Sequence, residues 1–164
     1  EETRELIKNI RQKIPGIAVR TTFIVGFPGE TEEDFGQLCD FVKEMRFERL
    51  GVFQYSHEED TAAYEMKDDV PESVKAERAN TLMAIQQEIS LELNQQKIGK
   101  VFKVLIDKKE GGFYYGRTEF DSVEVDNEVL IDASTNYCSV GGFCDVMIDD
   151  ATEYDLIGHV IQPE

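Results

Sequence analysis

The sequence predicts an α/β unit followed by an all-β domain. Up to about residue 96, apolar residues recur at helical spacing around two short β-branched runs, and after Gly99 the pattern changes to the alternation typical of strands. The 164 residues, of which 41% are hydrophobic, suffice for one ordinary domain or two small ones. We therefore expect residues 1–96 and residues 97–164 to form separate domains.

The first part of the chain is predicted to form helix, strand, helix and strand. Apolar residues at helical spacing predict a helix over residues 2–13, which a Pro-Gly pair ends. A strand is predicted to begin at Ile17, and the first half of residues 20–35 is a β-branched and aromatic run typical of a strand buried on both faces. A helix over 32–45 and a strand over 50–55 complete a parallel βαβ unit. This unit is too small for a closed barrel, so it is either a fragment of one or the edge of an open sheet.

The loop after the first strand combines turn residues with a helix start. Gly26 and Gly29 supply backbone freedom, and Pro28 fixes one φ angle. Thr31 and Asp34 resemble a capping box in which Asp replaces the usual Glu. Parallel α/β sheets bind ligands beyond the carboxyl ends of their strands, which would place this loop beside a binding site. A simple connection between strand and helix accounts for the same residues equally well.

A long helix is predicted to end the first part of the chain. A polar loop over residues 56–69 precedes it, and Pro71 stands near its first position. One apolar stripe runs down this helix to about Gln96, formed by Leu82, Ile85, Ile89 and Leu93. Such a stripe packs on its own protein far more often than on a partner.

The second part of the chain is predicted to contain five short strands joined by turns rich in Gly, Asn and Asp. The predicted strands cover residues 101–107, 112–118, 128–132, 143–148 and 155–161. Five strands in so short a segment suggest a small closed β-barrel of OB-like character.

Three stretches resemble the radical S-adenosylmethionine methylthiotransferases. Residues 22–35, TFIVGFPGETEEDF, look like the fifth strand and following turn of their barrel, and residues 52–56, VFQYS, resemble the sixth strand. With residues 154–158, YDLIG, the whole chain resembles the carboxyl-terminal part of the RimO type, which methylthiolates an aspartate of a small-subunit ribosomal protein. The resemblance implies a fragment of a radical S-adenosylmethionine partial TIM-like (β/α) barrel followed by a TRAM domain.

The resemblance also implies that part of an S-adenosylmethionine pocket lies in this chain. The residues that match the family's cofactor wall are Arg20, Thr22, Ile24, Gly26, Phe53 and Tyr55. By residue type alone, Arg20 could equally cap the strand at the surface, and the two aromatic residues could equally belong to the core. The intact enzymes hold two 4Fe-4S clusters, but the CxxxCxxC run that binds one of them is absent from the sequence. We therefore expect no catalytic or metal-binding residue here, and an inactive fragment.

The acidic composition bears on the partner of the protein. Its 34 Asp and Glu against 17 Lys and Arg give a net charge of -17, which repels phosphate backbones. From residue 97 onward, fourteen acidic residues outnumber six basic ones, which argues against transfer RNA and favours a basic ribosomal protein as substrate. The candidate substrate-binding residues are Glu119, Asp121, Glu124, Asp126 and Glu128. A solvated acidic loop accounts for these residues equally well.

Two other functions are compatible with the sequence. A transfer RNA adenosine methylthiotransferase of the MiaB class would use the same barrel wall. A non-catalytic acidic binding module would need no cofactor. Binding of transfer RNA that weakens steeply with salt would favour the first of these alternatives.

The cysteines and histidines predict neither a metal site nor a secreted protein. Cys39, Cys138 and Cys144 have unrelated spacings, which is typical of small buried residues. Because the sequence also shows no secretory leader and no membrane-spanning run, we expect a reduced, cytoplasmic protein. His57 and His159 have no second ligand at metal spacing and are expected in solvated loops.

Overall fold

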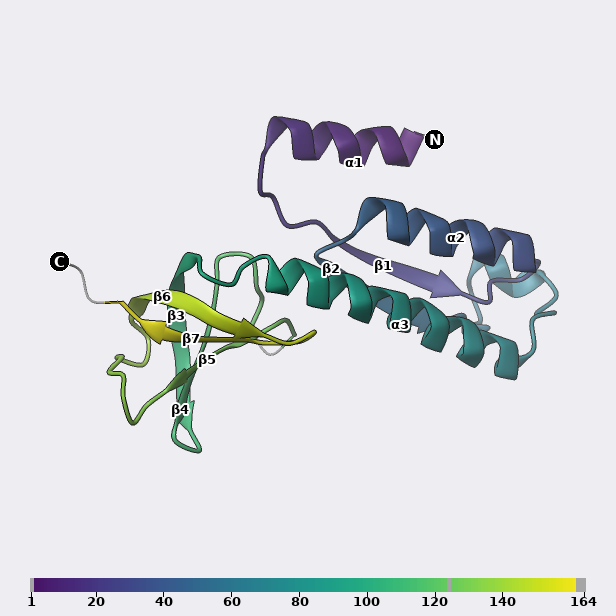
Figure 1. The fold of residues 1–164 in the computed structure, drawn as a ribbon. Coiled ribbons are helices and arrows are strands. Elements are labelled where there is room, and N and C mark those ends of the chain that lie inside the picture. The colour runs from purple at the N-terminus through teal and green to yellow at the C-terminus, as the bar shows by residue number, and fades with distance from the viewer. Residues whose placement is uncertain (1, 124, 162–164) are drawn as a thin grey trace. The chain divides into compact units, whose positions relative to one another are not determined.

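The computed structural model describes residues 2–123 and 125–161 (Figure 1). It consists of two compact units, the first ending at Ile89 and the second beginning at Ser90. The division lies inside the long helix α3 (Glu72–Gln95), which ends just before the domain boundary that the sequence predicts. None of the helices in the described ranges combines the length and hydrophobicity that a bilayer span requires.

The first unit contains a parallel βαβ unit, as the sequence predicts. Its elements are helix α1 (Glu2–Lys13), strand β1 (Arg20–Val25), helix α2 (Glu32–Met45) and strand β2 (Arg49–Gln54). The two strands pair in parallel, with Arg20 opposite Arg49 and Val25 opposite Gln54. The carboxyl ends of β1 and β2 therefore lie side by side.

Helix α2 begins at the predicted capping box. The Thr31 hydroxyl accepts a hydrogen bond from the Asp34 N–H at 3.1 Å, and the Asp34 carboxylate accepts one from the Thr31 N–H at 3.0 Å. The hydrogen bonds from the Thr31 side chain and backbone lower the pKa of Asp34. At the other end, Arg46 adopts a left-handed conformation with φ 49° and donates its N–H to the Val42 carbonyl. Local chemistry thus fixes both ends of this helix.

Helix α2 covers only one face of the β1–β2 pair. Phe23 of β1 packs edge-on against Phe41 of α2 and Phe47, with ring centroids 6.2 and 6.0 Å apart. On the opposite face, which we call the open face, Ile24 is 56% exposed and its partner in register, Phe53, is 65% exposed. The prediction that the first strand is buried on both faces is therefore wrong for the part of the chain described. An apolar sequence indicates that both faces of a strand are suited to burial, but it does not show which element buries them. None of the described elements covers the open face.

Helix α3 follows a polar connection that contains the short 3-10 helix η1 (Ala62–Glu65), which the sequence pattern does not reveal. Of the predicted apolar stripe of α3, Leu82 and Ile89 are buried, whereas Ile85 and Leu93 are half-buried. On the same helix, the buried Gln86 side chain donates a hydrogen bond from Nε2 to the Phe47 carbonyl at 2.9 Å. These contacts anchor α3 within the first unit.

The second unit is a closed five-stranded barrel, which confirms the predicted all-β domain. Its strands are β3 (Val101–Glu110), β4 (Phe113–Arg117), β5 (Val129–Asp132), β6 (Phe143–Ala151) and β7 (Leu156–Val160). The strand order around the barrel is β3-β4-β5-β7-β6. All neighbours are antiparallel except β5 and β7, which pair in parallel.

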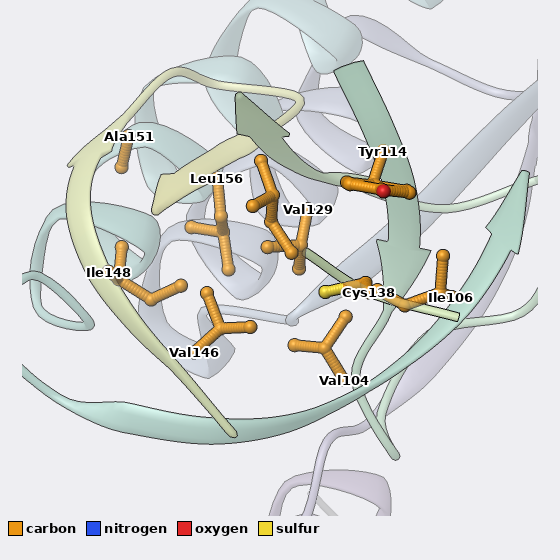
Figure 2. Close-up of a cluster of buried hydrophobic side chains, with 10 residues drawn as sticks. Val104, Ile106, Tyr114, Val129, Cys138, Val146, Ile148, Ala151 and Leu156 are labelled. Carbon is orange, nitrogen blue, oxygen red and sulfur yellow. The ribbon is translucent and has the colours of Figure 1, made fainter. Parts of the chain in front are cut away.

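Alternate side chains of the barrel strands point inward and fill the interior (Figure 2). The buried cluster consists of Val104, Ile106, Tyr114, Val129, Ile131, Cys138, Val146, Ile148, Ala151 and Leu156. The long strands β3 and β6 each contain one register shift, which lets a strand bend around a small barrel. At Gly158 of β7, a Cβ would lie 2.3 Å from the Met147 carbonyl oxygen, so only glycine lets these two strands approach so closely.

The last turns of α3 belong to the second unit. The Ser90 hydroxyl donates to the Glu153 carbonyl at 2.7 Å, and the Asn94 side-chain amide donates to the Thr152 carbonyl at 2.9 Å. Both acceptors lie in the turn between β6 and β7. The helix end is therefore fixed to the barrel by hydrogen bonds to main-chain carbonyls.

Candidate functional site

Four of the predicted cofactor-binding residues share the open face of β1 and β2. Arg20, Thr22 and Ile24 alternate along β1 and are exposed, while Phe23 between them packs toward α2. Phe53 of β2 stands opposite Ile24. The face is therefore apolar toward the carboxyl ends of the strands and carries a cation at the amino end. Such a surface can contact a flat heterocycle at one end and an anionic group at the other.

The other two predicted residues, Gly26 and Tyr55, lie just beyond the strand ends and are buried. The Tyr55 N–H donates to the Val25 carbonyl at 2.9 Å, which continues the pairing of the two strands. Gly26 has φ 75°, a conformation that favours glycine, and a Cβ on it would lie 2.3 Å from Cγ of Lys75 in α3. The structure therefore packs these residues against α3, whereas the other four are exposed on the open face.

An aromatic row extends from the ends of the strands. Phe27 contacts Tyr55 with ring centroids 5.2 Å apart, and His57 stacks on Tyr64 at 4.8 Å. The Tyr55 hydroxyl and His57 Nδ1 are 3.1 Å apart and share a hydrogen bond. His57 is exposed, as its predicted place in a solvated loop requires.

The loop after β1, residues 26–30, closes on itself through Glu30, and we call it the rim loop. Both Glu30 carboxylate oxygens accept the Gly26 N–H, each at 3.1 Å. The same carboxylate accepts a hydrogen bond from Arg78 Nη1 at 2.7 Å, and Arg78 also bonds the Glu30 carbonyl and the Glu32 carboxylate. Burial alone would lower the pKa of Arg78, but the pairs with Glu32 and Glu30 outweigh it and raise that pKa. Arg78 is therefore a permanently charged partner for Glu30.

Lys75 is a second buried cation beside the rim loop, with only 1% of its side chain exposed. Its Nζ pairs with Asp68 at 2.9 Å and with Glu72 at 2.7 Å, and it lies 5.3 Å from the centroid of the Tyr55 ring. Burial acts to lower the pKa of Lys75, but the hydrogen bonds with Asp68 and Glu72 outweigh burial and raise it. The aliphatic stem of Lys75 is thereby fixed against Gly26.

Sequence reasoning missed Lys75, Arg78 and Glu30 as parts of this site. A signal for the two cations existed, because they precede Leu82 by steps of three and four residues and so continue the apolar stripe of α3. A charged side chain on a buried stripe needs an ionic partner. The partner itself could not be predicted, because Glu30 lies 48 positions from Arg78 in the chain.

The barrel carries a surface pocket of about 250 Å³ next to two of the predicted acidic residues. Its lining consists of Lys103, Leu105, Arg117, Thr118, Glu119, Asp121 and Phe143. Glu119 is exposed, whereas Asp121 is buried and accepts a hydrogen bond from the Thr118 hydroxyl at 2.6 Å. Lys103 and Phe143 were not among the predicted residues, although the alternation of β3 and β6 placed them on the outer surface.

The remaining predicted acidic residues have separate environments. The Asp126 carboxylate accepts the Ser122 N–H at 2.7 Å and so orders the loop between β4 and β5. Glu128 is half-buried and forms an ion pair with Lys108 at 3.4 Å. Glu124 lies outside the described residues. The four predicted acidic residues that the structure describes therefore do not form one uniform face.

The cysteines and the second histidine occupy structural positions. Cys39 is buried in α2, where burial raises the pKa of its thiol. The sulfur atoms of Cys138 and Cys144 lie 2.6 Å apart as free thiols, and burial with the neighbouring Cys144 thiol raises the pKa of Cys138 to about 12. His159 is exposed, but it lies in strand β7 and not in the predicted loop, and its Nδ1 shares a hydrogen bond of 2.7 Å with the Asp149 carboxylate. In residues 2–123 and 125–161, no group of three His, Cys, Asp or Glu residues is placed to hold a metal ion.

Comparison with known proteins defines the class of the second unit. Residues 98–161 match the family model of the TRAM domain. The match includes all five barrel strands, so the closed barrel is a TRAM domain. The predicted fold class, an α/β region followed by a TRAM barrel, is confirmed.

The chain as a whole is similar to proteins named "Ribosomal protein uS12 methylthiotransferase RimO". It is 56% identical over 98% of its length to the protein of that name from Cytophaga hutchinsonii and 60% identical over 96% to that from Christiangramia forsetii. The identity to the Prosthecochloris aestuarii protein is 49% over 94% of the chain. The chain spans 37%, 35% and 36% of these three relatives. The chain is therefore similar over nearly its whole length to the carboxyl-terminal part of the RimO proteins, which confirms the resemblance seen in the sequence.

Proposed function

We propose that the chain is part of an enzyme that adds a methylthio group to the β-carbon of an aspartate in a small-subunit ribosomal protein. The observation that carries this proposal is the identity of 56% over nearly the whole chain to a relative whose name gives uS12 as its substrate. Because the chain spans only 37% of that relative, the activity belongs to the complete enzyme. Such a transferase would act in the cytoplasm, where ribosomal proteins are assembled.

The open face of β1 and β2 fits one wall of an S-adenosylmethionine pocket. Ile24 and Phe53 offer exposed apolar surface to the adenine, Thr22 offers a hydroxyl, and Arg20 suits the carboxylate at the other end of the cofactor. Gly26 would support the edge of this wall from the strand end. When bound, S-adenosylmethionine supplies the radical chemistry that removes a hydrogen atom from the substrate carbon.

The iron–sulfur clusters of the family do not fit the described residues. None of these residues forms a group of three possible metal ligands, and the sequence has no CxxxCxxC run. The cluster ligands would therefore belong to another part of the enzyme. We expect residues 1–164 alone to bind no cluster and to have no activity.

We assign recognition of the ribosomal protein to the TRAM domain. Fourteen acidic residues against six basic ones from residue 97 onward suit a basic protein partner and repel RNA. Among the proposed contacts, Glu119 is the exposed one beside the pocket, and Glu124, Asp126 and Glu128 belong to the same connection between β4 and β5. Asp121 is buried, so its contribution would be to order the loop that carries Glu119.

The proposed function is tested with the full-length gene product after reconstitution with iron and sulfide. We expect a methylthio group to appear on one aspartate of uS12 when S-adenosylmethionine and a reductant are present, as measured by peptide mass spectrometry. A uS12 variant with Asn at that aspartate is the matched control. Modification of transfer RNA in place of uS12 would contradict the proposal.

A transfer RNA methylthiotransferase of the MiaB class is the second candidate. The observation that favours it is the surface pocket, where Phe143 lies with Lys103 and Arg117, since exposed aromatic rings beside cations bind single-stranded nucleic acid. Arg117, however, is paired with Asp107 at 3.1 Å, and the charge of the domain opposes RNA binding. Affinity for transfer RNA that falls steeply with salt would favour this candidate. A full-length gene without a CxxxCxxC run would favour the non-catalytic binding module.

A further inference from the structure

The rim loop contains a buried ion pair between Glu30 and Arg78 of α3. Glu30 folds back so that its carboxylate accepts the Gly26 N–H at the end of β1. This carboxylate is only 12% exposed, and the guanidinium of Arg78, itself 5% exposed, lies 2.7 Å from it. A buried carboxylate that loses such a partner becomes unstable where it is. Without Arg78, we therefore expect Glu30 to turn toward solvent and to release the Gly26 N–H.

Lys75 fixes the same loop by packing. Gly26 has no side chain, and the stem of Lys75 fills the space that one would need, with Cγ 2.3 Å from the position of a Cβ. The ammonium group of Lys75 is held in turn by Asp68 and Glu72. Helix α3 thus contacts residues 26–30 at two points, through a packed stem and through an ion pair.

We propose that Arg78 and Lys75 are positioning residues for the nucleoside-binding wall, an inference that rests on the proposed function. Gly26 follows directly on the strand that carries Thr22 and Ile24, so a shift of the rim loop displaces the edge of that wall. Both cations are buried, and their polar contacts are with Glu30, Glu32, Asp68 and Glu72. They would therefore act through Gly26 and Glu30, without touching the cofactor.

Helix α3 itself offers a matched control. Gln86 is a buried polar residue about two turns beyond Arg78. Its side chain bonds the Phe47 carbonyl and not the rim loop. Gln86→Ala should lower the stability of the same unit without displacing Gly26. It therefore separates a general loss of stability from a specific loss at the pocket.

The experiment measures the dissociation constant of S-adenosylmethionine by calorimetry for the full-length protein, at a temperature where thermal unfolding shows every variant to be folded. We expect Arg78→Met to weaken binding roughly tenfold or more, as loss of a supporting residue behind a ligand site does. Arg78→Lys keeps the charge but not the two-pronged geometry, so its loss should be smaller. Gln86→Ala should bind the cofactor like the wild type while melting at a lower temperature.

The outcomes separate this inference from the proposed function. If the wild type binds S-adenosylmethionine and Arg78→Met binds it equally well, the positioning role is refuted and the function stands. An equal loss in Gln86→Ala refutes it as well. If the wild type does not bind the cofactor at all, the proposed function fails and the positioning role fails with it. If Arg78→Met does not fold, the dissociation constants of Arg78→Lys and Gln86→Ala are compared instead.

Discussion

Gly26 is the single residue whose replacement has the most direct steric consequence at the candidate site. Its φ of 75° disfavours any other residue, and a Cβ would lie 2.3 Å from Cγ of Lys75. The left-handed conformation costs about 1–2 kcal/mol for alanine, and overpacking adds about 1–3 kcal/mol. We therefore expect Gly26→Ala to lower the free energy of unfolding by about 2–5 kcal/mol, as measured by urea titration.

Replacement of Gly36 by alanine provides the control for the prediction at Gly26. It lies within α2, has no positive φ, and a Cβ on it would meet nothing within 4 Å. Gly36→Ala should therefore raise stability by roughly 0.5–1 kcal/mol through helix propensity. Equal stabilities for the two alanine variants would contradict the predicted cost of both the crowding and the positive φ at Gly26.

The capping box gives α2 a stability that depends on pH. The hydrogen bonds with Thr31 place the folded pKa of Asp34 below its ordinary value of 3.8. The contribution of Asp34 is therefore complete above that ordinary value and is lost as the pH falls through the folded pKa. We expect Asp34→Asn to show a smaller loss of unfolding free energy than the wild type between about pH 6 and about pH 2, measured by denaturant titration.

Replacement of Thr31 tests the other residue of the same capping box. Thr31→Ala removes the hydroxyl that accepts the Asp34 N–H and should cost about 1 kcal/mol at neutral pH. Thr31→Ser keeps the hydroxyl and should be close to the wild type. A wild-type stability for Thr31→Ala would mean that packing of α2 on the sheet alone fixes its start.

The whole molecule is divided into units that each contain their own core. The barrel is closed and is filled by its own buried side chains, which belong to strands β3 to β7 and one connection (Figure 2). We expect residues 90–164 expressed alone to unfold in one cooperative transition, followed by circular dichroism. Leu156→Ala removes a side chain with no exposed surface, so it should lower the midpoint of this unfolding transition. A gradual loss of the circular dichroism signal, both in residues 90–164 and in their Leu156→Ala variant, would show that the barrel needs the first unit.

The elements of this molecule could be predicted, but the burial of their faces could not. Helix α2 was predictable because its cap and its apolar stripe are local in the sequence, and the barrel strands were predictable from alternation and turns. The exposure of Ile24 and Phe53 depends on what covers a strand, which no local pattern encodes. The Arg78–Glu30 pair likewise depends on tertiary contact across the chain. That the predicted site residues on β1 share one face could be predicted, because alternate residues of any strand point to the same side.

The place of β7 between β5 and β6 has a consequence for biosynthesis. This strand is the last of the barrel to leave the ribosome, yet it completes the ring by pairing with one neighbour on each side. Until Leu156 to Val160 have emerged, the nascent domain has two unpaired edges, which invite association with other chains. Closure of the ring therefore waits for the synthesis of this segment, and a chain truncated before it would keep both edges unpaired and prone to aggregation.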